Sequence, residues 1–401
     1  MSADRLARID PVMQSFVDDR GFAGVSVLIA RHGKTVFEGQ YGYQDKEAGK
    51  PMTPDTIFRA YSMTKPIVST ALMILFEEGR FRLNDPVAKY LPAFGATKVL
   101  SGDGSLVDPV RPMTVRDLLS HTSGLTYDFL QDSPVGQMYR DAQLMNDPTR
   151  SLEQLIAELA SIPLAFQPGT RWHYSLGIDV VAHLIEVISG QPLGQFLQDR
   201  MFGPLGMTDT AFGVPAANLD RLSGMYGLPD LFAKGQTFGT LFEAFTNGFN
   251  QRSDVSDTYP TDTPDVFVRG GIGLYSTIGD YLRFAQMLSS NGELDGTRIL
   301  GRKTLELMHS NHLAPELLPF EIGGAPNPGF GFGLGSRVVM DVAQTGGPGS
   351  VGEYGWAGAA KTYYWVDPVE DLVGLLMTQY MVSFDQPEMD LRALTYQAII
   401  D

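Results

Sequence analysis

Cysteine is absent from the 401 residues of the chain. Without a thiol there is no cysteine nucleophile, disulfide framework, thiolate zinc site or iron–sulfur cluster. Long apolar runs are absent as well: no stretch of about 18 apolar residues occurs, and the N-terminal residues lack the apolar segment of a signal peptide. We therefore expect a soluble, cytoplasmic protein.

Positive charge is also scarce. The chain has 30 Lys and Arg residues against 46 Asp and Glu, which gives a formal net charge of −16. Such a chain repels the phosphates of nucleic acids and the surfaces of anionic membranes. The expected partners are therefore a small molecule and water, and neither nucleic acid nor a membrane.

The composition is typical of a globular protein, with 43% hydrophobic and 19% charged residues. At about 150 residues per domain, the length allows two or three domains or one large domain with insertions. β-rich patterns near both ends of the chain predict strands at 24–30, 35–41, 331–340, 353–366 and 372–380. Helical spacing predicts helices at 3–20, 62–78, 151–160, 176–188 and from about 387 onward.

These segments predict two interdependent domains with the active site at their interface. Residues 1–60 and 265–401 would form a discontinuous sheet domain, and residues 61–264 a mainly helical domain inserted into it. Residues 222–264 hold many aromatic side chains without a clear period. We interpret them as a loop-rich insertion that lines a site or forms a lid.

Several common site motifs are not fulfilled. No serine lies in the G-x-S-x-G context of an α/β-hydrolase. Residues 347–352 match G-x-G-x-x-G but lead into a strand pattern, and residues 33–35 (Gly-Lys-Thr) lack the first glycine of a phosphate-binding loop. His309 and His312 have neither the glutamate nor the spacing of a zinc motif. We therefore expect neither a cofactor nor a metal.

Residues 58–67 contain a candidate nucleophile. Proline is tolerated in the first turn of a helix because the N–H groups there have no intrahelical partner, so Pro66 places Ser62 at a helix start. Residues at i and i+3 share a face, which lets the amine of Lys65 reach the hydroxyl of Ser62. A lysine whose pKa is depressed by burial can serve as the base. The alternative is an N-capping serine followed by a solvated lysine.

Further motifs accompany Ser62-x-x-Lys65 in a fixed order. They are Leu118-Leu-Ser-His-Thr-Ser-Gly-Leu125, Gln167-Pro-Gly169, Tyr174-Ser175-Leu176, Pro204-Leu-Gly-Met207 and Trp356-Ala-Gly358. Over roughly residues 10–395 the chain resembles the serine β-lactamase and penicillin-binding-protein superfamily, class C in particular. The resemblance implies an α/β (α+β) serine β-lactamase-like fold, with an antiparallel sheet flanked by helices plus an inserted mainly helical domain.

Two departures from the β-lactamase pattern bear on the substrate. Leu176 stands where a lactamase has asparagine, and Trp356 stands where it has the lysine of Lys-Thr-Gly. The amide and the cation that bind the amide and carboxylate of a lactam are therefore both missing. The combination of Tyr-Ser-Leu with Trp-x-Gly resembles the family VIII carboxylesterases, which hydrolyse esters.

The resemblance implies roles for the matched residues. Ser62 would attack the ester carbonyl and form an acyl-enzyme, and Lys65 and Tyr174 would share the task of general base. A charged Lys65 would favour the phenolate of Tyr174. The oxyanion hole would consist of the backbone N–H groups of Ser62 and Ala359.

The expected substrate-binding residues are Trp356, Gly358, Tyr127, Phe129 and Leu176. Trp356 would favour uncharged esters because it replaces a cation with an apolar ring. For the aromatic residues, packing in the core is the alternative interpretation. We expect His121 and His173 to be structural, since this kind of site uses no catalytic histidine.

Two other functions are compatible with these motifs. One is an amidase, peptidase or acyltransferase of the same fold, with weak β-lactam hydrolysis as a possible side activity. The other is a non-catalytic acyl-binding domain that keeps the fold.

Overall fold

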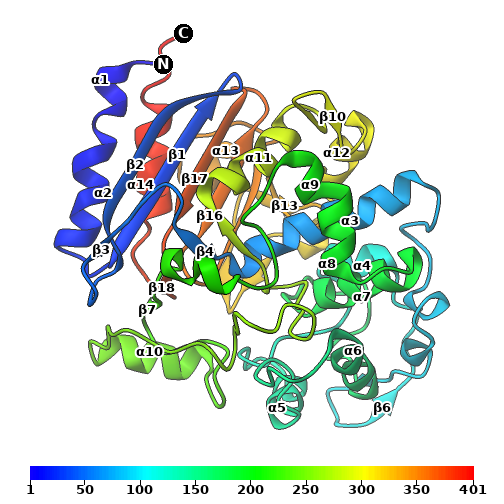
Figure 1. The fold of residues 1–401 in the computed structure, drawn as a ribbon. Helices are drawn as coiled ribbons and strands as arrows, with labels where there is room; N and C mark the ends of the chain where they lie inside the picture. Colours follow the sequence, from blue (N-terminus) through cyan, green and yellow to red (C-terminus); the bar gives the residue numbers. More distant parts are fainter.

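The computed structural model describes all 401 residues, and an antiparallel sheet lies at its centre (Figure 1). The strand order is β13-β14-β15-β16-β17-β1-β2-β3, so strands from the two ends of the chain lie side by side. This confirms the predicted antiparallel sheet. Its strands are β1 (Gly24–Arg31), β2 (Lys34–Asp45), β3 (Lys50–Pro51), β13 (Phe330–Phe332), β14 (Arg337–Val339), β15 (Tyr354–Ala357), β16 (Tyr363–Asp367) and β17 (Leu372–Met377).

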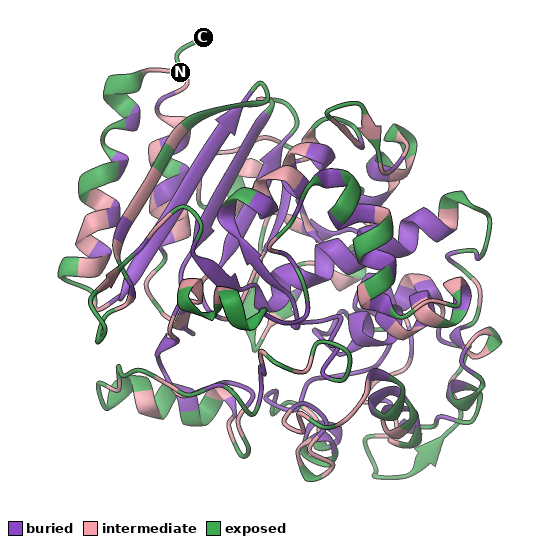
Figure 2. Cartoon of the chain, viewed as in Figure 1, coloured by how far each residue is buried: buried purple, intermediate pink, exposed green.

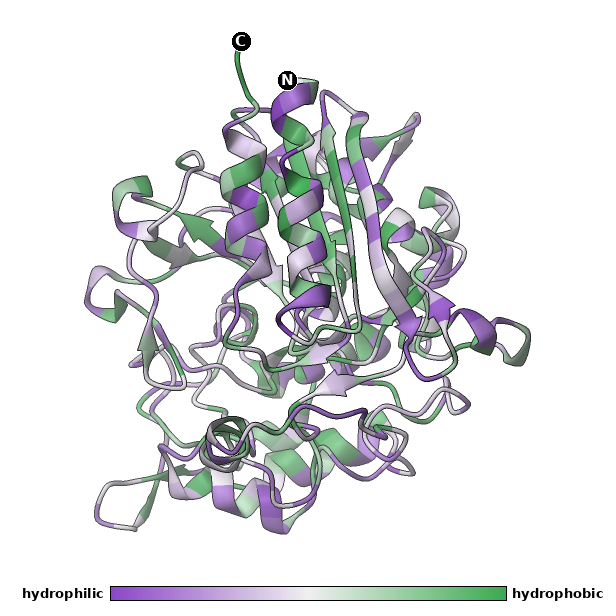
Figure 3. Ribbon diagram, turned by 90° about the vertical axis from the view of Figure 1, so that its left-hand side faces the viewer, coloured by the Kyte–Doolittle hydropathy of each residue, from purple (hydrophilic) through white to green (hydrophobic).

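Helices cover both faces of the sheet. Every residue of β1 is buried, because one face packs on α2 and the other on α11. Figure 3 looks onto the α2 face and shows hydrophobic and hydrophilic residues alternating along its helices. The covering helices are α1 (Ala3–Leu6), α2 (Ile9–Asp18) and α14 (Pro387–Tyr396) on one side and α11 (Ile278–Ser289) on the other.

The N-terminal helix differs from the prediction of one helix over 3–20. It is interrupted at Ala7 and Arg8, which separate α1 from α2. Pro11 lies in the first turn of α2, and a proline ring clashes with the carbonyl four residues before it. A continuous helix through Ala7 is therefore excluded.

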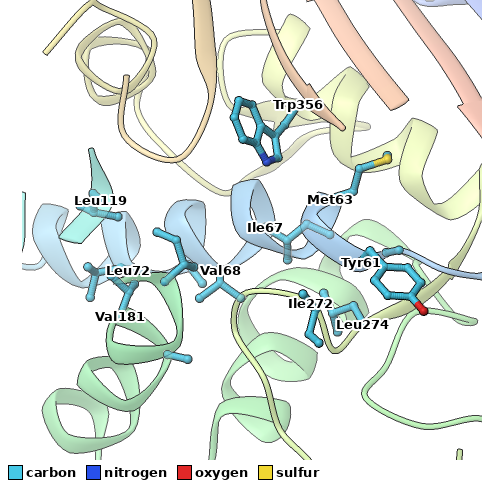
Figure 4. Packing of buried hydrophobic residues seen from close by; sticks show 14 of the residues in the cluster. Tyr61, Met63, Ile67, Val68, Leu72, Leu119, Val181, Ile272, Leu274 and Trp356 are labelled. Carbon is cyan, nitrogen blue, oxygen red and sulfur yellow. The ribbon is translucent and has the colours of Figure 1, made fainter. Parts of the chain in front are cut away.

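The helical part surrounds α3 (Thr64–Glu77), whose residues from Thr64 to Leu75 are all buried. Figure 4 shows Trp356 on the sheet side of α3 and Val181 of α7 on the opposite side. α7 ends at Gly190, which has φ +77°. The other helices here are α4 (Val115–Leu119), α5 (Pro134–Asp141), α6 (Leu152–Ser161), α7 (Gly177–Ser189), α8 (Leu193–Leu197) and α9 (Gly203–Leu205).

The insertion at 222–264 contains one helix, α10 (Phe238–Thr246), which the sequence analysis missed. Its start is fixed by a capping box between Thr237 and Thr240. Before it, β7 (Tyr226–Gly227) pairs in parallel with β18 (Tyr380–Met381). The insertion is thus attached to the last strands of the chain.

Short elements complete the fold. They are β4 (Ile57–Arg59), β5 (Val99–Leu100), β6 (Leu106–Val107), β8 (Tyr275–Thr277), β9 (Glu293–Leu294), β10 (Thr297–Arg298), β11 (Glu321–Ile322), β12 (Ala325–Pro326), α12 (Arg302–Met308) and α13 (Val342–Thr345). No helix is both long enough and apolar enough to cross a membrane.

Two apolar clusters lie on opposite faces of the sheet, and Figure 2 shows that the central strands between them are largely buried. The smaller cluster joins the sheet to α2 and α14. The larger one runs without interruption from the sheet through α3 to α7, and so includes residues of both predicted domains. The domain limits themselves stay a prediction.

Candidate active site

A tight turn carries Ser62 from β4 into α3. Residues Tyr61–Met63 form a single 3₁₀ turn, and α3 begins at Thr64, two residues later than predicted. Tyr61 has φ +46°, a strained conformation for a bulky residue. Its backbone N–H donates to Tyr259 Oη at 3.3 Å, and its buried ring stacks on Phe232. These contacts hold the turn that presents Ser62.

Ser62 Oγ lies between two polar side chains. Tyr174 Oη donates to it at 2.6 Å, and Lys65 Nζ lies 3.1 Å away. Ser62 caps no helix, because the N-cap residue of α3 is Met63. Lys65 is only 1% exposed, so the alternative of a solvated lysine is excluded. The structure therefore brings the three predicted catalytic residues together.

Burial reduces the basicity of the Lys65 amine to a strength that suits a general base. It lowers the pKa of Lys65 to about 7, while the carboxylate of Asp179 partly opposes this shift. Lys65 Nζ also donates to the carbonyl of Gly271 at 2.8 Å and lies 4.5 Å from the ring centre of Tyr174. An amine with this pKa can accept a proton from Ser62 near neutral pH.

Asp179 is a site residue that the sequence analysis missed. It lies fully buried in the first turn of α7, where its Oδ1 accepts from the N–H of Gly271 at 3.1 Å. Burial raises its pKa, and Lys65 opposes that rise. A signal was available: Asp179 is an acidic residue in the first turn of a largely apolar helix that begins three residues after Tyr174.

Tyr174 lies in the loop before α7, with its ring 5.7 Å from that of Trp356. Burial raises the pKa of its phenol, although the hydrogen bond to Ser62 works in the opposite direction. That Lys65 favours a Tyr174 phenolate stays a prediction. The phenol is a proton donor to Ser62, and Lys65 is the stronger candidate for the base.

The end of β15 approaches the Ser62 turn closely. A Cβ on Gly358 would lie 2.5 Å from the carbonyl oxygen of Ala60, so only glycine fits there. Thr362 Oγ1 donates to the same carbonyl at 3.0 Å and joins the two segments. The N–H of Ala359 has no hydrogen-bond partner in the chain. It is free to act as the predicted oxyanion donor beside Ser62.

A cavity of about 270 Å³ opens above Ser62. Its wall includes Tyr174 and five predicted pocket or oxyanion residues: Tyr127, Phe129, Trp356, Gly358 and Ala359. The insertion and the last loop add lining residues that the sequence did not specify, among them Leu231, Phe232, Phe238 and Val382. Of the 20 lining residues, 12 are hydrophobic, so the cavity suits an apolar ligand.

The charged groups of the cavity wall are already engaged. Lys361 Nζ pairs with Glu388 at 3.0 Å. Arg337 donates to the hydroxyl of Tyr363, and its guanidinium lies 4.8 Å from the ring centre of Phe330. Trp356 occupies the position where a lactamase has a cation. Arg337 has no acidic partner and keeps its positive charge, whereas the apolar part of the wall around Trp356 favours an uncharged group.

The structure corrects the prediction for Leu176. This side chain is fully buried and does not line the cavity. Its backbone N–H donates to the carbonyl of Thr126 at 3.2 Å, and α7 begins at the next residue. Because the chain turns into the helix here, the side chain packs into the core instead of facing a substrate.

The two histidines hold neighbouring loops, and the ring centre of His121 also lies 5.0 Å from that of Tyr174. His121 Nδ1 lies 3.1 Å from Ser175 Oγ, and His173 Nε2 lies 2.8 Å from Thr126 Oγ1. Burial lowers the pKa of both rings, that of His173 to about 4. The lowered pKa favours the neutral form of each ring. Nowhere do three or more His, Asp or Glu side chains converge so that they could hold a metal ion.

The sequence is similar to known proteins over most of its length. The family model described as Beta-lactamase matches residues 9–398. Esterase EstB of Burkholderia gladioli is 33% identical over 387 residues, which cover 94% of this chain and 91% of EstB.

Solved structures resemble the fold of this chain over nearly its whole length. EstCE1, a hydrolase with promiscuous acyltransferase activity, superposes with a TM-score of 0.80 at 30% identity, covering 98% of this chain and 99% of its own. A family VIII carboxylesterase shares the fold, with a TM-score of 0.72 at 20% identity and coverage of 100% and 99%. These likenesses confirm the predicted fold class.

Proposed function

The chain belongs to the β-lactamase family, and from this membership and the geometry around Ser62 we propose that it is a carboxylesterase. It is a carboxylic ester hydrolase that cleaves short-chain esters through an acyl-enzyme on Ser62. The observation that carries the proposal is Ser62 Oγ held between Lys65 and Tyr174 at the base of an apolar cavity. The likeness to EstB and EstCE1 supports ester hydrolysis.

Acylation begins with neutral Lys65. Its amine takes the proton of Ser62 while Oγ bonds to the carbonyl carbon of the ester. The carbonyl oxygen becomes an oxyanion and accepts hydrogen bonds from the N–H groups of Ser62 and Ala359. Losing one such donor typically costs about 2.7–4 kcal/mol of transition-state stabilisation.

The leaving alcohol needs a proton, and Tyr174 is placed to give it. As the bond between the carbonyl carbon and the alcohol oxygen breaks, the Tyr174 phenol protonates that oxygen and regains a proton from the ammonium of Lys65. Water then attacks the acyl carbon and gives its proton to Lys65. The acid leaves, and Ser62 Oγ recovers the proton from Lys65.

Acyl transfer is the second candidate, because the acyl-enzyme would lie in a mostly apolar cavity. An alcohol bound there would compete with water for the acyl group. The promiscuous acyltransferase activity described for EstCE1 supports this candidate. Adding a primary alcohol during turnover and measuring the new ester distinguishes the two outcomes.

The central experiment compares three acyl donors. We expect turnover of p-nitrophenyl acetate and butyrate, and much slower turnover of nitrocefin and of a p-nitroanilide amide. Ser62→Ala should lower ester turnover by at least about 10³-fold with an unchanged circular dichroism spectrum. Retained activity in folded Ser62→Ala would refute the mechanism, and faster turnover of nitrocefin than of esters would refute the substrate class.

Partners and location stay predictions as well. The proposed partners are an uncharged small-molecule ester and water. Cell fractionation would test the expected cytoplasmic location.

A further inference from the structure

Three exposed phenylalanines form one cluster. Of the 23 phenylalanines in the chain, Phe242, Phe245 and Phe384 are the strongly exposed ones, at 56%, 45% and 51%. The ring centre of Phe384 lies 4.4 Å from that of Phe245 and 6.0 Å from that of Phe242. We call these three residues the aromatic rim. Single exposed apolar residues are ordinary, but a contiguous group marks a binding surface.

The aromatic rim continues the wall of the active-site cavity. On α10, Phe238, Leu241, Phe242 and Phe245 follow the spacing of one helix face. Phe238 lines the cavity, and Phe245 lies seven residues further, about 10 Å along the axis. This helix is largely exposed in Figure 2.

A second segment of the chain also leads from the cavity to the aromatic rim. Val382 and Ser383 line the cavity, and Phe384 comes directly after them. β18, which precedes them, is paired with β7 of the insertion, and Figure 1 shows β18, β7 and α10 close together. Two segments that are far apart in sequence therefore lead from the catalytic cavity to the same exposed rings.

The size of the cavity bears on the function of the aromatic rim. Its volume of about 270 Å³ is below the roughly 300–1,000 Å³ of pockets that hold drug-sized ligands. An ester with a large apolar group would fill it and extend through its mouth. The surface that such a group meets along α10 is apolar and aromatic. An anionic lipid surface is a poor alternative ligand for the rim, because the net charge of the chain is strongly negative.

We propose that the aromatic rim is a substrate subsite, which binds the apolar group of an ester where that group projects from the cavity. The enzyme would then also accept esters with a long or bulky apolar group, in addition to short ones. This inference rests on the proposed function and extends it. Since the rim touches only the remote part of the substrate, it acts on binding and leaves the reacting atoms unchanged.

The test compares chain lengths in a rim variant and a matched control. The rim variant is Phe242→Ser/Phe245→Ser/Phe384→Ser. The control, Val110→Ser/Val351→Ser/Val369→Ser, removes three residues that are 88%, 62% and 68% exposed and do not line the cavity. Each protein is assayed on p-nitrophenyl esters from acetate to dodecanoate and on acetates of ethanol and dodecanol.

We expect the rim variant to keep kcat/KM on the short esters within about twofold. On the long esters of at least one series kcat/KM should fall about tenfold through a higher KM, the loss expected when roughly two methylene groups lose apolar contact. The control should behave as the unmodified chain. Equal values for rim variant and control on every ester would overturn the proposal.

Two further outcomes are decisive. If sedimentation shows a dimer that the rim variant converts to a monomer, the occupant is a second copy of the chain and the proposal is wrong. If the unmodified chain cleaves no ester at all, the proposed function fails instead. Calorimetric binding of dodecyl methyl ketone, which cannot be hydrolysed, then still tests the rim: equal affinity for rim variant and control would refute it.

Discussion

At the floor of the cavity, Ser62 Oγ lies 2.6 Å from Tyr174 Oη and 3.1 Å from Lys65 Nζ, whereas at the aromatic rim Phe384 meets two other rings without a hydrogen bond. The floor side chains are buried and the rim side chains are about half exposed. Polar interactions gain strength in a buried environment and depend on exact distances. Apolar contacts at the surface depend mainly on the area that is covered.

Backbone strain lies beside both regions, since Tyr61 next to Ser62 has φ +46° and Val382, two residues before Phe384, has φ +45°. Tyr127 Oη and Asp179 Oδ2 are buried without a partner, and a Cβ on Gly271 would lie within 2.8 Å of both. The floor differs from the rim in these buried polar groups, which proteins usually pair. The floor therefore determines the reaction, while the rim would change the choice of substrate without changing the reaction.

The largest expected effect comes from Lys65→Arg. Arginine keeps the positive charge but stays protonated at any pH of the assay, so it cannot take the proton of Ser62. We expect kcat for p-nitrophenyl butyrate to fall by about 10²–10⁴-fold, the usual contribution of a general base. Val110→Ser/Val351→Ser/Val369→Ser serves as the control, since these residues do not line the cavity and the variant should keep kcat on the same ester. Nearly normal turnover by Lys65→Arg would mean that Lys65 acts only through its charge.

A moderate effect is expected from pH and from Asp179→Asn. Because the base is the neutral form of Lys65, whose pKa is about 7, kcat/KM should fall as the pH drops below that value. The Asp179 carboxylate raises the pKa of Lys65, so its removal should lower that pKa and shift the acid limb of the pH profile to lower pH. Asparagine can still accept from the N–H of Gly271. An unchanged profile would show that Asp179 has a structural role alone.

The floor was the part of the site that the sequence specified best. The i, i+3 spacing of Ser62 and Lys65 is a local helical relation, and Pro66 placed the helix start to within two residues. Tyr174 and Ala359 came from motifs with a strong resemblance. The distances among them depend on the fold as a whole, and so does the burial that lowers the pKa of Lys65. Neither follows from spacing.

The aromatic rim could not be predicted from the sequence because it is formed by contacts between residues that are far apart in the chain. Phe384 meets Phe245 of α10 beside the point where β18 pairs with β7, far away in the sequence. The sequence predicts only a loop-rich insertion where α10 lies. The helical spacing of Phe238, Leu241, Phe242 and Phe245 is hard to recognise there, because glycines and threonines, which favour helices weakly, lie between them. In the same way, Leu176 matched a motif position that faces substrate elsewhere, but its side chain packs into the core at the start of α7.

The smallest expected effect concerns stability at the rim. Phe245→Ser/Phe384→Ser removes rings that are about half exposed, so the free energy of unfolding in urea should change by no more than about 0.5 kcal/mol per site. Phe129→Ala, in the cavity wall, removes a ring that is 3% exposed and packs on Tyr127 and Phe232, and should cost about 3–5 kcal/mol. If the rim variant lost as much stability as Phe129→Ala, the rings would be structural, and the contrast between a fixed floor and an adaptable rim would fail. A small loss combined with a changed chain-length profile is the result that only a substrate subsite explains.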